Sequence, residues 1–345
     1  MSLSSQRILK SDQLIAHYTK VGVSLSTVSI PPIIGSPVES SYGYRSKLTP
    51  HFDGPHRKRV MTSIGPIGFR SKWGERIVDV DKCPIATDAI NERMSKLRAE
   101  ISDSIDRGEI DCGKTLLLRD DGKGFVETGH NKVVTEVVST KNGDKVFEFR
   151  AGNFFQTNPS MVPSMVDYVT SVSSRPLVGH KKSLSTFLDF YCGSGLFSIC
   201  VSSHFERCIG VELNIHSVQE ATANALRNGS TNCKFVAGLS ATIFKTVTNG
   251  NETDVDPLQS VVFCDPPRKG CGKEFLEQLL DFGPARIVYM SCEPASQAKE
   301  AKTLIDSGKY ELVELQAFDL FPQTRHIECC AVFERVNDVQ KNEMK

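Results

Sequence analysis

Four stretches in the second half of the chain carry residue types that could do chemistry: residues 189–197, 261–270, 287–294 and 319–330. The first runs from an apolar segment into a Gly-x-Gly turn, Gly193 and Gly195, ahead of a predicted helix. Such a turn lets a nucleotide-like ligand approach the backbone closely, although the same pattern can be a purely structural turn. Glu212 stands 17 residues after Gly195, at the end of the next predicted strand, where a carboxylate can accept both hydroxyls of a ribose. This context favours a ligand site.

The glycine pattern also restricts the type of ligand. A dinucleotide fold usually has a third glycine three residues after the second, where the pyrophosphate meets the helix, but Ser198 stands at that position. S-adenosylmethionine (SAM) contains adenosine and no phosphate, so it fits this pattern better than NAD does. An NAD-dependent oxidoreductase would share the turn and Glu212 but would have no use for the Asp-Pro-Pro and Ser-Cys stretches.

The other three stretches each bring a reactive side chain to one terminus of a predicted strand. Asp265 follows an apolar strand and precedes two prolines, which fix the turn and remove amide donors, so its carboxylate should point into the cleft above the sheet. Cys292 follows a strand and precedes Glu-Pro, a context that favours a presented thiol over the buried thiol that most cysteines are. Glu328 lies near the start of the last strand and would face Cys292 if that strand is antiparallel.

Two neighbours of Glu328 have less specific interpretations. His326 could contact a substrate or serve as a structural hydrogen-bonding group. Arg325 fits a phosphate contact or a solvated charge better than a catalyst.

From about residue 185 onward, strand and helix patterns alternate. We predict strands at 186–191, 207–212, 233–236, 260–264, 286–291, 310–318 and 327–334, with helices at 217–227, 273–281 and 295–305. Such alternation predicts an α/β, doubly wound sheet. Too few residues separate the last two strands for a crossover helix, so the final strand should run antiparallel.

The first half of the chain has a different pattern. Between about residues 40 and 155, short alternating runs and one convincing helix at 86–105 indicate an α+β domain with an antiparallel sheet. Residues 1–40 and 336–345 show no strong period. We therefore predict an N-terminal extension (1–40), a central domain (41–155), an α/β domain (156–335) and a C-terminal tail (336–345).

Composition excludes several classes of protein. The 41 basic and 41 acidic side chains cancel, which argues against a general polyanion binder but allows a local basic face. Eleven cysteines without a CxxC pair indicate neither a disulfide framework nor a metal site. No apolar run approaches the ~20 residues of a membrane span, and the first 20 residues lack a leader pattern. We therefore expect no membrane partner and an intracellular location, in the nucleus, the cytoplasm or both, with a mitochondrial pool as a further option.

Six sequence elements in order resemble one family, the SAM-dependent RNA uracil-5-methyltransferases, which make ribothymidine. They are Tyr44-Arg45-Ser46-Lys47, Phe154-Phe155-Gln156-Thr157-Asn158, Tyr191-Cys192-Gly193-Ser194-Gly195, Asp265-Pro266-Pro267-Arg268-Lys269-Gly270, Ser291-Cys292-Glu293-Pro294, and Phe321-Pro322 followed by His326-Ile327-Glu328. The resemblance covers about residues 40–335, and the segment 42–53 looks most like the fungal tRNA branch, which modifies the T-loop uridine. It implies a Rossmann-like, seven-stranded class I SAM methyltransferase domain preceded by a smaller α+β domain that faces RNA.

The resemblance assigns roles motif by motif. The matched SAM-binding positions are Gln156, Tyr191, Leu196, Glu212 and Asp265, the nucleophile is Cys292 and the proton acceptor is Glu328. The family often has Asn where Leu196 and Glu293 stand, so local differences are expected at the methionine end of the cofactor and in the nucleophile loop. The cluster-binding cysteines of the ribosomal-RNA members are absent, so no iron–sulfur cluster is expected. Many members begin with an OB-like barrel, for which forty residues are too few.

The implied reaction explains why these groups are needed. Carbon 5 of uracil is too weak a nucleophile to attack a sulfonium methyl, and addition of the Cys292 thiolate at carbon 6 makes an enolate that can attack. Glu328 would then remove the proton from carbon 5 and release the enzyme. Asp265 could also accept the uracil N3–H and so reject cytosine.

The resemblance implies a tRNA substrate, and the sequence indicates no obligate protein partner. Phe154 could stack on a base turned out of its loop, or it could be an ordinary core residue. Candidate contacts to the RNA backbone are Arg45, Lys47, His56, Arg57, Lys58 and Arg59, although the run at 56–59 could equally be a solvated loop. Two alternatives stay open: the same chemistry on a different RNA, and a largely non-catalytic tRNA-folding partner.

Overall fold

The computed structural model describes residues 1–54, 64–72, 74, 76–110, 112–177, 183–238, 244 and 255–336. The chain divides into two compact units: unit 1 comprises Met1–Ser36, Val137–Phe147 and Met161–Lys345, and unit 2 comprises Pro37–Glu136 and Glu148–Ser160. This division differs from the predicted boundaries. The first 36 residues, expected as a separate extension, belong to unit 1, and the chain passes between the units several times instead of once near residue 155.

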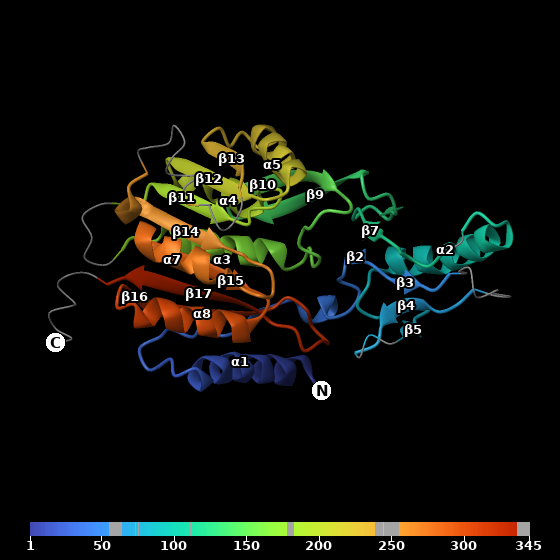
Figure 1. The fold of residues 1–345 in the computed structure, drawn as a ribbon, viewed down its shortest axis with the longest axis horizontal. Coiled ribbons are helices and arrows are strands. Elements are labelled where there is room, and N and C mark those ends of the chain that lie inside the picture. The colour runs from blue at the N-terminus through green and yellow to red at the C-terminus, as the bar shows by residue number, and fades with distance from the viewer. Residues whose placement is uncertain are drawn as a thin grey trace. The chain divides into compact units, whose positions relative to one another are not determined.

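Unit 1 is built on an eight-stranded sheet in the order β1-β16-β17-β15-β14-β11-β12-β13 (Figure 1). Its strands are β1 (Ile34–Gly35), β11 (Thr186–Phe190), β12 (Arg207–Glu212), β13 (Cys233–Ala237), β14 (Ser260–Cys264), β15 (Arg286–Ser291), β16 (Tyr310–Asp319) and β17 (Glu328–Arg335). Neighbouring strands are parallel except at β17, which is antiparallel to β15 and β16. The predicted Rossmann-like fold with an antiparallel last strand is therefore confirmed. The N-terminal segment adds the short edge strand β1, which the sequence analysis did not predict.

Helices cover both faces of this sheet. They are α1 (Leu3–Lys20), α3 (Val162–Ser174), α4 (Leu196–Val201), α5 (Ile215–Arg227), α7 (Lys273–Phe282) and α8 (Pro294–Asp306). Helices α1, α7 and α8 share one hydrophobic core with the sheet face that carries Leu188, Val262 and Ile287. On the opposite face, Phe197 of α4 packs on Phe263 with ring centroids 4.5 Å apart. Every residue of β11, β14 and β15 is buried, which explains their continuous apolar sequences.

Helix α1 corrects the prediction that residues 1–40 lack regular structure. It begins after Ser2, whose hydroxyl accepts a hydrogen bond from the Ser5 amide, and it lies alongside α8 (Figure 1). Its buried residues are Lys10, Leu14 and Tyr18, spaced four apart. A stripe this narrow, with a lysine in it, gives only a weak apolar period, so the sequence pattern missed the helix.

Unit 2 contains the long helix α2 (Asp88–Asp106) and two small antiparallel sheets. Their orders are β2-β7-β8 and β5-β4-β3-β6, with strands β2 (Lys47–Leu48), β3 (His51–Phe52), β4 (Ile67–Arg70), β5 (Ile77–Asp79), β6 (Lys114–Thr115), β7 (Leu118–Asp120) and β8 (Val126–Glu127). Helix α2 buries Ile90 and Met94 against Leu118, as its amphipathic sequence predicts. Strands β9 (Val133–Thr140) and β10 (Gly143–Arg150) pair with each other, and each contributes residues to both units.

The central strand β11 should be the most sensitive part of the unit 1 core. Leu188 is 0% exposed, so Leu188→Ala should lower the free energy of unfolding by about 2–5 kcal/mol through lost contacts and an unfilled cavity. Leu226 on α5 is 80% exposed and provides the matched control, since Leu226→Ala should change the stability by less than about 0.5 kcal/mol. Urea unfolding followed by circular dichroism measures both variants, and equal effects would contradict the placement of the core.

Candidate active site

A tight glycine turn follows the central strand β11. Gly193 and Gly195 have φ angles of 54° and 87°, in the region that favours glycine, and Tyr191 adopts a φ of 67° despite its side chain. A Cβ atom on Gly195 would lie only 3.0 Å from side-chain carbons of Ile199 and Phe235. The turn therefore holds its backbone against the start of α4 and needs glycine at this position.

Glu212, the last residue of β12, lies beside this turn. Its Oε2 accepts a hydrogen bond from the Gly193 amide at 3.2 Å, and its Oε1 accepts one from the Asn214 amide at 2.9 Å. These bonds fix the carboxylate at the carboxyl edge of the sheet, with lone pairs left to accept further hydrogen bonds. The glycine turn and the carboxylate that the sequence singled out are thus adjacent.

Two further predicted cofactor residues flank the turn. Leu196 is the first residue of α4 and is buried, so it presents an apolar side chain where the family often has Asn. The ring of Tyr191 is half-buried, with its centroid 6.0 Å from that of Phe275. Both residues belong to the same edge of unit 1 as Glu212.

Asp189 is a residue that the sequence analysis did not assign to the site. It is fully buried in β11, and its Oδ2 accepts hydrogen bonds from the Ser198 hydroxyl at 2.6 Å and amide at 3.1 Å. Its Oδ1 is buried without a hydrogen-bond partner among the described residues. Burial, which outweighs the two Ser198 hydrogen bonds, raises the pKa of this carboxyl to about 7. A charged residue inside an apolar strand, just before the glycine turn, was the available sequence signal.

The antiparallel register brings three predicted residues to one place. Ser291, the last residue of β15, pairs with Cys329 of β17. Because the two strands are antiparallel, Cys292, which follows Ser291, is level with Glu328, which precedes Cys329. Asp265 follows β14, the parallel neighbour of β15, at the same edge of the sheet. The charges of Asp265 and Glu328 both act on the Cys292 thiol.

The electrostatic environment of Cys292 keeps its thiol protonated in the ligand-free protein. Burial is the largest cause that raises the pKa of Cys292 to about 11, and the charges of Glu328 and Asp265 add to it. The Arg268 guanidinium opposes this shift through its charge and a hydrogen bond to the sulfur. At neutral pH only about one thiol in 10⁴ would be the reactive thiolate at that pKa.

The two carboxyl groups beside Cys292 also have raised pKa values. Burial raises the pKa of Glu328 well above its usual range, and the negative charge of Asp265 raises it further. Burial raises the pKa of Asp265 to about 7. Carboxyl groups shifted in this way are better proton acceptors than solvated ones, because a higher pKa makes the carboxylate a stronger base.

Arg268 is the second residue that the sequence analysis left without a role. Its cation lowers the pKa of Cys292, against the two carboxylates that raise it. One guanidinium nitrogen, Nη2, also lies 3.5 Å from Nδ1 of His326. His326 therefore lies at the same edge, in contact with Arg268, and Arg325 is exposed.

The other four cysteines near this edge are buried: Cys192, Cys264, Cys329 and Cys330. The Cys329 thiol donates to the carbonyl of Ser291 and to Oε1 of Gln297. Cys292 alone in this set is partly exposed. Cys292 is thus the more accessible thiol of these five, and its role as the nucleophile stays a prediction.

The predicted RNA-facing residues lie in unit 2. Phe154 is 69% exposed, so it is not the core residue that the sequence allowed, whereas Phe155 stacks on Phe149 with ring centroids 4.4 Å apart. Gln156 is buried in unit 2, so its contact with a cofactor stays a prediction.

The basic residues of unit 2 differ from the predicted phosphate contacts. The Lys47 ammonium donates to the carbonyls of Gly152 and Asn153, both at 2.9 Å, and burial is the largest cause that lowers its pKa to about 8. Arg45 is partly buried and donates to the Lys47 carbonyl. Lys47 therefore supports the segment that carries Phe154. The run His56, Arg57, Lys58 and Arg59 lies outside the described residues.

Comparison with known proteins gives the chain a family. It is 37% identical to the tRNA (uracil(54)-C(5))-methyltransferase of Schizosaccharomyces pombe over 97% of this chain and 61% of that protein. It is 32% identical to the Saccharomyces cerevisiae enzyme of the same name over 89% of this chain and 55% of that protein. The crystal structure of Pyrococcus abyssi tRNA (uracil-54, C5)-methyltransferase, in complex with S-adenosyl-L-homocysteine, has a TM-score of 0.67 and 21% identity, covering 96% of this chain and 84% of that one.

The strand order and the glycine turn beside Glu212 define unit 1 as a Rossmann-like domain of the methyltransferase class. The chain belongs to the tRNA (uracil-5-)-methyltransferase family, whose profile matches residues 115–336. It spans about 55–61% of the length of the two fungal relatives.

Two kinds of feature are absent from the described ranges. No helix there combines the length and apolar character that a bilayer crossing needs. No group of three or more His, Cys, Asp or Glu side chains in those ranges is arranged around a common metal position.

The charges around Cys292 predict opposite effects of two substitutions. Glu328→Gln removes a like charge, so the pKa of Cys292 should fall and its alkylation at pH 9 should become about two- to tenfold faster. Arg268→Met removes the stabilising cation, so alkylation should slow by a similar factor. Iodoacetamide labelling, quantified at the Cys292 peptide by mass spectrometry, measures both rates, and Cys292→Ala provides the blank. Shifts of the same sign in the two variants would refute this arrangement.

Proposed function

We propose that this protein is a SAM-dependent tRNA (uracil-5-)-methyltransferase that converts uridine 54 of the T-loop to 5-methyluridine through a covalent adduct with Cys292. Family membership and the printed activity of the two fungal relatives support the substrate and the reaction. The observation that carries the mechanism is the register of β15 and β17, which places a thiol level with a buried carboxyl group.

The residues at the edge of unit 1 fit SAM. The glycine turn lets the backbone lie close to a ligand and lacks the third glycine that dinucleotide folds place at the pyrophosphate. Glu212 offers carboxylate lone pairs for the ribose hydroxyls. Leu196, at the start of α4, offers an apolar side chain beside the turn. When bound, SAM supplies an electrophilic methyl group on a sulfonium. The complex of the Pyrococcus abyssi enzyme with S-adenosyl-L-homocysteine supports this cofactor.

Cys292 acts first in the proposed mechanism. Its thiolate adds to carbon 6 of uracil, forming the S–C6 bond while the C5–C6 double-bond electrons move toward carbon 5 and the O4 enolate. The Arg268 cation stabilises the thiolate that the two carboxylates disfavour. A proton on Glu328 at this stage would remove one of those opposing charges. The electron pair on carbon 5 then forms the bond to the methyl group while the methyl–sulfur bond breaks, and its electrons leave with the thioether S-adenosylhomocysteine.

Glu328 acts last. Its carboxylate removes the proton from carbon 5, the C–H electrons restore the C5–C6 double bond, and the S–C6 bond breaks to return the Cys292 thiolate. The raised pKa of Glu328 suits this step because it strengthens the base. Asp265, at the same edge, accepts the uracil N3–H and excludes cytosine, which has no proton there.

The substrate and product are tested by incubating the protein with SAM labelled in the methyl group and unmodified tRNA. The tRNA is then digested and the label is mapped to a nucleoside and a position. We expect 5-methyluridine at the T-loop uridine, and a tRNA with cytidine at that position serves as the control. Label on another nucleoside, or on another RNA in preference to tRNA, would overturn the assignment. Restored tRNA folding without any label would favour the RNA-folding alternative.

The mechanism predicts that Cys292 and Glu328 variants fail at different steps. Cys292→Ala should form no covalent RNA adduct, because the nucleophile is missing. Glu328→Gln should add and methylate but eliminate about 10²-fold or more slowly, the lower range for loss of a general base, so an adduct should accumulate only with SAM. Denaturing electrophoresis with labelled tRNA measures the adduct.

A substrate with 5-fluorouracil provides the control, because carbon 5 then carries no proton and even the parent protein should be trapped. Cys330→Ala is the matched cysteine control, since Cys330 is a buried cysteine of β17, two positions after Glu328. Trapping of the fluorinated RNA by Cys292→Ala would move the nucleophile to another cysteine. Normal turnover by Glu328→Gln would move the base elsewhere.

A further inference from the structure

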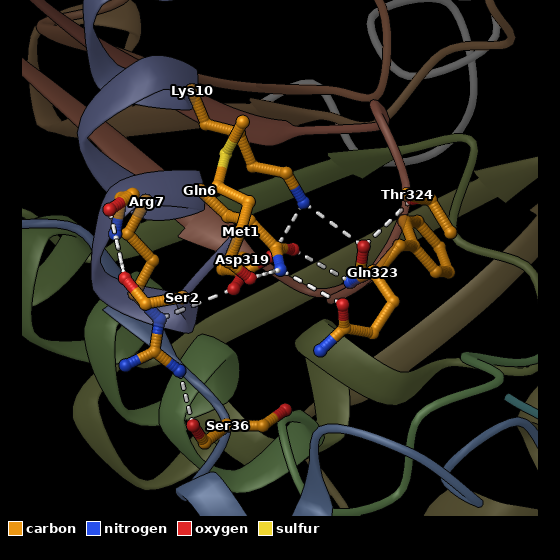
Figure 2. A network of polar contacts seen from close by, with 11 residues as sticks. Met1, Ser2, Gln6, Arg7, Lys10, Ser36, Asp319, Gln323 and Thr324 are labelled. Atoms are coloured by element: carbon orange, nitrogen blue, oxygen red, sulfur yellow. Dashed lines mark hydrogen bonds and ion pairs between the residues drawn. The ribbon is translucent and has the colours of Figure 1, made fainter.

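The segment that leads into Glu328 is held by helix α1. Residues 320–327 connect β16 to β17, and Glu328 is the first residue of β17. Figure 2 shows side chains of Gln6, Arg7 and Lys10, all on α1, turned toward Asp319 at the end of β16 and Gln323 of this segment. These groups belong to unit 1 together with Cys292 and Glu328.

The deepest contact is a buried ion pair. Asp319 is 0% exposed and Lys10 is 3% exposed, and the Lys10 ammonium lies 2.6 Å from Oδ1 of Asp319. Arg7 Nε donates to the other oxygen, Oδ2, at 3.2 Å. Lys10 also donates to the carbonyl of Phe321 at 3.0 Å, so one ammonium ties the end of β16 to the start of the loop (Figure 2).

A second contact fixes a strained residue in the loop. Gln323 has a φ of 63°, which is uncommon for a residue with a side chain. Its amide donates to Oε1 of Gln6 at 3.0 Å, and Nε2 of Gln6 donates to Oε1 of Gln323 at 2.9 Å (Figure 2). The Gln6 side chain thus satisfies both the backbone and the side chain of Gln323, and it compensates for this unfavourable conformation.

The register connects these contacts to the base. Glu328 pairs with Phe318 of β16, and Asp319 is the next residue. Asp319 also pairs with Gly35 of β1, where a Cβ atom would lie only 2.5 Å from the Arg7 guanidinium. The strand end beside Glu328 is therefore enclosed by α1 on one side and by β1 at the edge.

The far end of α1 is linked to β17 through Gln297 of α8. The Tyr18 hydroxyl donates to Oε1 of Gln297 at 2.8 Å, and Nε2 of Gln297 donates to the carbonyl of Tyr289 at 2.7 Å. The Cys329 thiol, next to Glu328, donates to the same Oε1 at 3.0 Å. Helix α1 thus contacts the surroundings of Glu328 from two points along its length.

We propose that α1 is the positioning element for Glu328, with Gln6 and Lys10 as positioning residues that act through the loop 320–327. A buried ion pair is weak evidence for stability, because desolvation offsets much of its Coulomb energy; burial indeed lowers the pKa of Lys10. Fixing one conformation of a strand end is a function that such a pair can serve. This inference rests on the proposed role of Glu328 in the elimination step.

The test uses Gln6→Ala in the full chain, because alanine keeps the helix and leaves no unpaired charge. We expect the single-turnover rate of methyl transfer to stay within about twofold of the parent and the elimination rate to fall about tenfold, since a misplaced base costs 10–10² in rate. The fraction of protein trapped as SAM-dependent RNA adduct during turnover should rise accordingly. In the ligand-free protein, hydrogen exchange should quicken at residues 320–327.

Two variants separate positioning from stability. Gln13→Ala lies on the same helix at an exposed position and should match the parent in all measurements. Gln6→Glu keeps an acceptor for the Gln323 amide, and the Gln323 side chain can turn its own NH₂ toward the carboxylate, so this variant should restore elimination. Lys10→Met, which removes both the Asp319 and the Phe321 contacts, should accumulate adduct as Gln6→Ala does.

Three outcomes decide the inference. Slowed elimination that Gln6→Glu rescues supports it. If the rates of addition, methyl transfer and elimination all fall together with the melting temperature, α1 has only a structural role and the inference is overturned. Rates and exchange equal to those of Gln13→Ala would also overturn it. If the parent protein itself forms neither 5-methyluridine nor an adduct, the proposed function fails, a result distinct from an active parent with unaffected variants.

Discussion

The antiparallel insertion of β17 between β15 and β16 is the constraint on which the site depends. Parallel strands bring only their carboxyl ends to the ligand-binding edge, so a parallel β17 would place Glu328 at the opposite edge from Cys292. Because β17 runs the other way, its first residue comes level with the residue that follows β15. A thiol and a carboxyl group 36 positions apart in the sequence thus become neighbours.

That neighbourhood has an electrostatic consequence. Glu328 and Asp265 together disfavour the thiolate that the proposed reaction requires, and Arg268 opposes them. Burial raises the pKa of both carboxyl groups, and the charge of Asp265 adds to the shift at Glu328, so each is a stronger base when it is ionised. Proton positions at this edge are therefore coupled: a proton on one carboxyl group favours the thiolate, and its loss creates the base that the proposed mechanism needs for its last step.

The N-terminal 36 residues belong to this arrangement. They contribute an edge strand and a helix to unit 1, and both reach the strand end beside Glu328. Asp319 takes part in both contacts, since its backbone pairs with β1 and its carboxylate accepts hydrogen bonds from Arg7 and Lys10 of α1. Unit 2 presents its own feature, an exposed Phe154 on a segment that Lys47 holds by two backbone carbonyls.

Much of unit 1 could be predicted from the sequence because its signals are local. Strands buried on both faces read as continuous apolar runs, and the glycine turn and Asp-Pro-Pro segment mark strand ends. The short connection before β17 was enough to infer its direction. These three local features gave the fold, and the motif resemblance gave the candidate nucleophile, base and cofactor residues.

What only the tertiary structure decided depends on groups far apart in the chain. Helix α1 was missed because its buried stripe is narrow and contains Lys10, whose partner Asp319 is 309 positions away. Three other features likewise depend on spatial neighbours. They are the bonds of Lys47 to backbone carbonyls, the buried Asp189 oxygen without a hydrogen-bond partner among the described residues, and the effect of Arg268 against the two carboxylates. A sequence states which side chains carry charge, but the sign and size of their effect on one another follow from distance and burial, which the folded chain alone fixes.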